Sequence, residues 1–286
     1  MWLLLFLLIL TGASPSFAQD STVSASPSAD TVTPEITATA SATATPAPPT
    51  PTPRLFDQYK KDYLFQYDQY QQDYLVYVDK KRVYTKYGTI TTQKEKFSAA
   101  ISAINSRNKA FKSYLLALRV LLDDYKSANP TQTEKNQIDL GKWEAWFAEQ
   151  VTVVPAINND DDLKKWTEDF KEKYIVIQGV IYTSLVQHEI NLRQLTLDRL
   201  QDIATDIRNN PNIRPESQQW ISSLTVKSDL VSTSFNSSLT YTRKNQSQTK
   251  FSNFYPDSKI ELIKGNNYLR EISADLKLIV TKFYSQ

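Results

Sequence analysis

Residues 55–87 read LFDQYKKDYLFQYDQYQQDYLVYVDKKRVYTKY and hold the most regular pattern in this 286-residue chain. Aromatic residues recur here at steps of four and three positions, and the members of this tyrosine stripe are Tyr63, Tyr67, Tyr70, Tyr74 and Tyr77. Such spacing puts all five rings on one side of an α-helix, while the charged residues of the stretch fall elsewhere. The stretch therefore predicts a long amphipathic helix whose aromatic side is covered by a partner helix.

Proline divides the rest of the chain into segments of helical length. The five prolines after position 53 each lie between periodic segments: Pro130, Pro155, Pro211, Pro215 and Pro256. Proline inside a helix costs about 3 kcal/mol, so these positions predict boundaries, and Gly88 is a typical C-terminal stop for the first helix. No segment shows a convincing strand pattern. The predicted fold class is all-α: an elongated antiparallel bundle of five or six long amphipathic helices with coiled-coil-like seams.

The starts of the later helices carry recognisable signals. Capping-box spacing predicts three of them, from Thr92 with Glu95, Thr131 with Glu134, and Ser258 with Glu261. The aspartates 160–162 follow two asparagines and favour a fourth helix that continues to Asn209 and includes Leu192 and Ile203 among its contacts. A fifth helix begins at Pro215, and residues 240–250 form a candidate loop.

Asn108 interrupts the apolar seam of the second helix, which otherwise follows a 4–3 spacing from Phe97 to Tyr125. A single buried asparagine in such a seam fixes the register of paired helices, at some cost in stability. Asn108 is therefore a candidate for setting the register. The alternative is that the seam drifts around the helix and leaves Asn108 in water.

Residues 174–187, with the sequence YIVIQGVIYTSLVQ, carry no charge. A segment that is apolar nearly all round predicts the buried centre of a bundle. The alternative is a segment that enters lipid after rearrangement, with the membrane-contact candidates Ile175, Val176, Ile177, Val180 and Ile181. Because a membrane span needs about 20 apolar residues, burial is the preferred interpretation.

The N-terminal 54 residues indicate export. Residues 2–10 form an apolar run, and small residues at positions 16 and 18 predict a signal peptide over residues 1–18, in the style of bacterial export. No Lys or Arg precedes the run, which leaves an uncleaved signal anchor as the alternative. Residues 19–54 are rich in Ser, Thr, Pro and Ala and predict a disordered linker or stalk, with glycosylation left open. The bundle domain then spans residues 55–286. Outside residues 2–10, no stretch is long and apolar enough to be a transmembrane helix.

Composition excludes several kinds of chemistry. The chain has no cysteine and one histidine, His188, which lies in a helical pattern without a nucleophile motif. No catalytic, metal-binding or cofactor-binding residues are therefore assigned, and no cofactor is expected. Residues 1–53 hold three acidic residues and no basic one, so residues 54–286 carry a net charge of +5 while the whole chain carries +2. That small excess on a mixed surface gives no indication of nucleic-acid binding.

These observations predict a secreted or surface-displayed, non-enzymatic helical scaffold or interaction module. Its expected partner is a protein or a cell-envelope polymer, and the tyrosine stripe is the candidate surface that binds it. Self-association through an uncovered seam is a further expectation. Two alternatives stay open. One is a membrane-active protein that inserts residues 174–187, and the other is an envelope glycan hydrolase that uses two of the 31 carboxylates.

Overall fold

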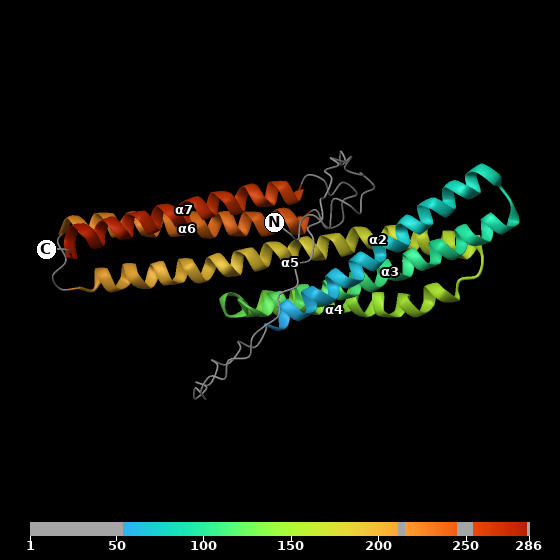
Figure 1. The fold of residues 1–286 in the computed structure, drawn as a ribbon. Helices are drawn as coiled ribbons and strands as arrows, with labels where there is room; N and C mark the ends of the chain where they lie inside the picture. Colours follow the sequence, from blue (N-terminus) through green and yellow to red (C-terminus); the bar gives the residue numbers. More distant parts are fainter. Residues whose placement is uncertain (1–53, 211–214, 245–253, 285–286) are drawn as a thin grey trace, which may run out of the picture. The chain divides into compact units, whose positions relative to one another are not determined.

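The computed structural model describes residues 54–210, 215–244 and 254–284, and within these residues all regular structure is helical (Figure 1). The all-α prediction is therefore confirmed. The elements are α2 (Leu55–Tyr87), α3 (Ile90–Asp123), η1 (Lys126–Ala128), α4 (Pro130–Val153), η2 (Val154–Ala156), α5 (Asp160–Arg208), α6 (Pro215–Lys244) and α7 (Phe254–Tyr284). The predicted signal peptide, and the linker up to residue 53, lie outside the described residues.

The first helix has the predicted bounds, whereas the predicted start of the second is wrong. Helix α2 ends at Gly88, which adopts a left-handed conformation with φ of 60° and donates its N–H to the carbonyl of Tyr84. Helix α3 is capped by Thr89, not by Thr92: the Thr89 hydroxyl accepts from the backbone of Thr92, and the Thr92 hydroxyl accepts from the backbone of Thr89. A threonine at the third helical position thus takes the place expected for Glu95.

Asparagine caps the next two helices. The Thr131–Glu134 capping box is absent because Asn129 caps α4 and Pro130 occupies its first position. The predicted start of α5 is confirmed, since Asn159 accepts from the backbone N–H of Asp162 at 2.8 Å. Helix α5 is unbroken over 49 residues, which at 1.5 Å per residue gives a length of about 70 Å.

Two further boundaries differ from the sequence prediction. Helix α6 continues through Lys244, so residues 240–244 are helical rather than a loop. Helix α7 begins at Phe254, one turn before the predicted cap at Ser258. Ser258 is instead fully buried inside the helix, and its hydroxyl lies 2.6 Å from the hydroxyl of Ser238 on α6. A serine that looks like a cap in the sequence therefore serves as a contact between helices.

Consecutive helices pack side by side and antiparallel. Lys80 of α2 pairs with Glu95 of α3 near their connection, while Tyr63 of α2 meets Tyr114 farther along α3. Helix α4 returns along α3, and α5 runs back along α4. Helices α6 and α7 pack on each other and on α5 (Figure 1). Helix α5 thus contacts α3 and α4 as well as α6 and α7.

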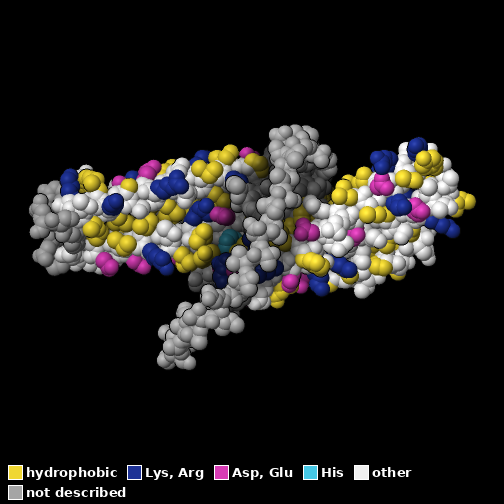
Figure 2. Space-filling model, viewed as in Figure 1, with side chains coloured by type: hydrophobic (Ala, Val, Ile, Leu, Met, Phe, Trp, Pro, Cys, Tyr) yellow, Lys and Arg dark blue, Asp and Glu magenta, His cyan; other side chains and the backbone are white. Residues whose placement is uncertain are grey.

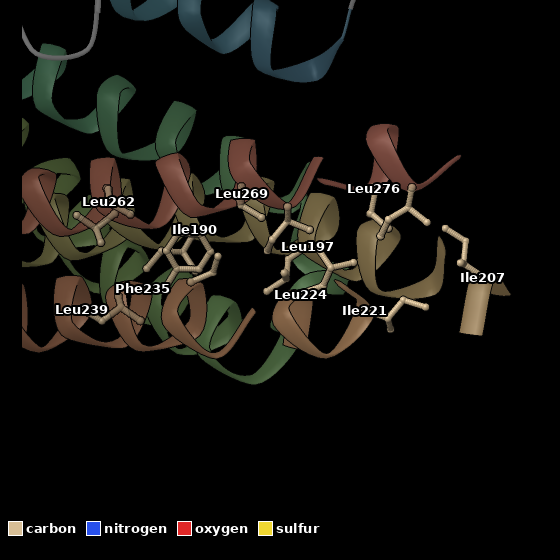
Figure 3. Packing of buried hydrophobic residues seen from close by; sticks show 14 residues of the cluster. Ile190, Leu197, Ile207, Ile221, Leu224, Phe235, Leu239, Leu262, Leu269 and Leu276 are labelled. Carbon is tan, nitrogen blue, oxygen red and sulfur yellow. The ribbon is translucent and has the colours of Figure 1, made fainter. Parts of the chain in front are cut away.

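The C-terminal helices enclose an aliphatic core with α5 (Figure 3). Ile190 and Leu197 of α5 face Leu224 and Phe235 of α6, and Leu269 of α7 closes the same core. Leu192 and Ile203, which the sequence pattern placed among the contacts of α5, are 38% and 44% exposed. Those two contact predictions are wrong, since the buried side of α5 passes through Ile190 and Leu197.

Candidate interaction surface

The five stripe tyrosines form a ladder along α2. Successive ring centroids lie 6.0 to 6.3 Å apart with tilted planes, in the order Tyr63, Tyr67, Tyr70, Tyr74, Tyr77. The ladder continues onto α3, because the ring of Tyr63 lies 5.3 Å from the ring of the fully buried Tyr114. These distances lie within the range in which aromatic rings attract one another. The structure therefore brings all five predicted stripe residues together on one side of the helix.

Helix α3 meets this ladder with a row of small side chains that the sequence analysis missed. The row repeats at steps of three, four and seven, and each member is at most 8% exposed: Ala99, Ala103, Ser106, Ala110 and Ala117. Small residues leave room for large rings on the facing helix, which explains how an aromatic helix packs closely here. The small residues recur with the same helical period as the apolar seam of α3, and that period is the signal that would have revealed them.

Helix α2 is nevertheless covered on one side only. None of its residues is buried, and α3 is its main neighbour. Tyr74 of the ladder is 46% exposed, and Phe65 and Leu75, outside the ladder, are 68% and 67% exposed. Figure 2 shows apolar side chains interspersed with charged ones at the right-hand end of the molecule, where Figure 1 places α2 and α3. The ladder is thus half-buried, because α3 covers it only in part.

A shallow groove of about 320 Å³ lies between α2 and α3 beside the ladder. Asp73, Val76 and Lys80 line it from α2, and Glu95 and three small residues line it from α3. The ammonium of Lys80 lies 2.8 Å from the carboxylate of Glu95, so that pair neutralises itself at the edge of the groove. The groove offers hydroxyl and carboxylate groups next to aromatic rings.

The phenols of Tyr63, Tyr67 and Tyr70 are held in their neutral form. Burial raises the pKa of Tyr63 and of Tyr70, since removal from water disfavours the phenolate. The hydroxyl of Tyr67 accepts a hydrogen bond of 2.7 Å from Gln71, and burial raises its pKa as well. The ladder therefore presents ring faces and hydroxyl groups, which suit binding by ring stacking and hydrogen bonds rather than covalent chemistry.

Arg107 joins the ladder to an aromatic cluster on α5. Its guanidinium carbon lies 4.0 Å from the ring centroid of Phe170 and 5.6 Å from that of Trp166. Burial lowers the pKa of Arg107 to about 10, while the nearby Tyr70 and Tyr174 act to raise it. The arginine keeps its positive charge at pH 7. Sequence reasoning passed over this residue because the pattern alone does not show which neighbours surround it.

The register candidate Asn108 is fully buried. Its side chain has 0% exposure, and neither its amide nitrogen nor its oxygen has a hydrogen-bond partner. The alternative of an asparagine in water is therefore wrong. An amide buried in this way costs about 1–3 kcal/mol.

The uncharged segment of α5 is mostly interior. Ile177 and Ile181, two of the membrane-contact candidates, are 0% and 1% exposed, and Ile175 and Val180 are half-buried. Val176 differs and is 45% exposed. The structure thus distributes these five side chains around the helix, with two of them in its core. Across the described parts of the chain, no helix has the combined length and hydropathy that crossing a membrane requires.

His188 lies partly buried near Tyr125, with 5.4 Å between the ring centroids. Burial lowers its pKa, so the imidazole is neutral at pH 7. Within residues 54–210, 215–244 and 254–284, no group of three His, Asp or Glu side chains is placed to hold a metal ion. Comparison of the chain with protein-family models, curated proteins and solved structures found no match.

Proposed function

We propose that this chain is a secreted or surface-displayed, non-enzymatic helical module that binds a cell-envelope polymer through the tyrosine ladder and the adjoining groove. One observation carries the proposal: α2 holds a continuous ladder of tyrosines, buries none of its own residues and leaves Tyr74 46% exposed. Long runs of aromatic side chains are normally covered in a helical protein, and a run that is covered only in part favours a binding surface.

The chemistry of the ladder favours a polymer of sugars over an apolar peptide. Its rings offer flat faces at a spacing of 6.0 to 6.3 Å, and its hydroxyl groups donate or accept hydrogen bonds at the edge of each ring. The groove beside it adds Ser98, Ser102 and the carboxylate of Asp73. The export pattern of residues 1–18 supports a location where such polymers occur.

The test is sedimentation of the purified full chain with isolated envelope glycan. Tyr74→Ala is expected to weaken binding, because it removes the most exposed ring of the ladder. The matched control is Phe65→Ala, which removes an even more exposed ring from the opposite side of α2. Equal loss in both variants, or no binding by the parent chain, would contradict the proposal. Binding to an envelope protein that Tyr74→Ala abolishes would assign the surface to a protein partner instead.

The membrane-active alternative makes a different prediction. Insertion of residues 174–187 requires Ile177 and Ile181 to leave the core, which removes their contacts with the bundle. Flotation of the full chain with anionic liposomes, without loss of the tertiary fold, would favour that alternative. We expect the chain to remain unbound, because Ile177 and Ile181, two of the side chains that lipid would contact, are covered by protein.

A further inference from the structure

Arg107 is held in an unusual setting for a cation. It sits on α3, against the ring of Phe170 at 4.0 Å and near that of Trp166 on α5, and within electrostatic range of Tyr70 on α2. Aromatic faces attract a guanidinium, which explains part of its placement. The faces supply no hydrogen-bond acceptors in the plane of the guanidinium, where its five N–H groups point.

The charge of Arg107 has no partner in the described part of the chain. No carboxylate lies within ion-pair distance, no hydrogen bond involves its side chain, and its Nε is buried without an acceptor. Arg119 and Arg193, by contrast, pair with Glu144 and Glu189. Half-buried arginines are normally paired because an isolated charge loses its hydration without a replacement.

We infer that Arg107 is an oxyanion-recognition site within the proposed binding face, and that it takes a carboxylate or phosphate group carried by the polymer. A guanidinium matches two oxygens of such a group with two parallel N–H donors. The ring of Phe170 on one side excludes water and so strengthens this interaction. Tyr70 belongs both to the ladder and to the surroundings of Arg107, and its neutral hydroxyl is a further donor.

The inference rests on the proposed function and narrows it to an anionic polymer. A uronate and a phosphodiester present the same oxyanion chemistry to Arg107. The flanking rings of Tyr67 and Tyr74 lie 6.3 and 6.0 Å from the ring of Tyr70, and they would stack on the sugar units on either side of the charged group. One cation beside a row of rings thus predicts selectivity for a glycan that bears spaced negative charges.

The experiment is a titration of the ¹⁵N-labelled full chain, monitored by NMR at the Nε–H group of Arg107. Sodium glucuronate and glycerol 3-phosphate are the two probes, and neutral glucose is the control ligand. At least one anion is expected to shift the Arg107 signal in a saturable manner. The probe that causes the shift shows whether the site takes a carboxylate or a phosphate. A shift with both probes supports a site that recognises either oxyanion.

Two substitutions give the test its specificity. Arg107→Met is expected to weaken anion binding about tenfold or more, which corresponds to the loss of one charge-assisted pair. Arg107→Lys keeps the charge but loses the two parallel N–H donors of the guanidinium, so an intermediate loss of anion affinity is expected. The matched control is Arg82→Met, which removes an exposed arginine of α2 whose carboxylate partner is Asp79. Circular dichroism checks that each variant remains folded.

The inference is overturned if neither anion shifts the Arg107 signal, or if Arg107→Met binds both anions as the parent does. These results leave the proposed function intact when envelope glycan still binds and Tyr74→Ala still weakens it. If glycan binding is absent while the small anions still shift Arg107, the anion site stands and the proposed function fails. The parent titration decides the matter even if Arg107→Met does not fold.

Discussion

Gly265 on α7 lies against Phe235 and Ser234 of α6, and replacing it by alanine tests how tightly these helices pack. A methyl group built at Gly265 would lie 2.6 Å from Cε1 and 2.9 Å from Cδ1 of Phe235. Ordinary carbon contacts are about 3.5–4.0 Å, so the ring of Phe235 would have to move. That ring is only 3% exposed and belongs to the aliphatic core with Leu262 and Leu269.

Two opposing effects set the size of the change. In the middle of a helix, glycine is about 1 kcal/mol less favourable than alanine, so propensity alone favours Gly265→Ala. Inserting a methyl group into a packed core costs about 1–3 kcal/mol, because side chains and backbone must shift. Since both short contacts are with a buried ring, we place the packing cost at about 2–3 kcal/mol. The expected net result is a loss of about 1–2 kcal/mol in the free energy of unfolding.

The assay is urea unfolding followed by circular dichroism, and Gly141→Ala on α4 is the matched control. A methyl group at Gly141 would lie 3.4 Å from Cζ of Arg119, an ordinary contact with the far end of a flexible side chain. We therefore expect Gly141→Ala to stabilise the chain by about 0.5–1 kcal/mol. In combination with Phe235→Leu, the cost of Gly265→Ala should fall by about 1 kcal/mol or more. A Gly265→Ala variant as stable as Gly141→Ala would refute the close packing of α6 and α7.

Three further substitutions test the interior and the surface. Asn108→Leu should raise the free energy of unfolding by about 1–3 kcal/mol in urea titrations, because both amide atoms are buried without partners; a loss would show that the amide is satisfied. Burial raises the pKa of Tyr174 to about 12, so the unfolded chain, with a tyrosine pKa of about 10, loses its proton first and stability falls above pH 10. Tyr174→Phe should reduce that fall by up to about 1.4 kcal/mol per pH unit, and an unchanged slope would contradict the burial of the phenol. Lys227 lies 2.8 Å from Asp275 and 3.2 Å from Glu271, so Lys227→Met should cost about 0.5–1 kcal/mol at low salt; a cost unchanged in 1 M NaCl would rule out the ionic origin.

The helix boundaries that could be predicted from the sequence are those set by backbone geometry. Gly88 ends α2 because a left-handed residue is needed there, and Asn159 starts α5 because its side chain replaces a missing helical acceptor. Hydroxyl residues were less informative. Thr89, Thr92 and Ser258 all resemble caps, and only the local backbone and the neighbouring helix decide which role each takes.

The candidate surface was predictable in its residues but not in its exposure. The spacing of Tyr63, Tyr70 and Tyr77 placed them on one side of a helix, and the structure confirms that arrangement. Their exposure depends on the width of the neighbouring helix, and α3 presents a narrow row of small residues that includes Ala103 and Ala110. Arg107 could not be identified as unpaired, because pairing depends on contacts among α2, α3 and α5.

The centre of α5 shows why an uncharged segment of sequence has two interpretations. Val186 belongs to the core with α6 and α7, while Asn191, one turn later, donates to the hydroxyl of Thr133 on α4 at 2.9 Å. Gln187 in turn donates to Asn191 at 2.7 Å, and all three polar side chains are fully buried. A helix surrounded by other helices can keep such groups because neighbouring helices supply partners, as Thr133 does for Asn191, whereas lipid supplies none. The absence of charge in the sequence does not show whether glutamine, asparagine and threonine have hydrogen-bond partners. The contact of Asn191 with Thr133 on α4 is what favours an interior position for this segment.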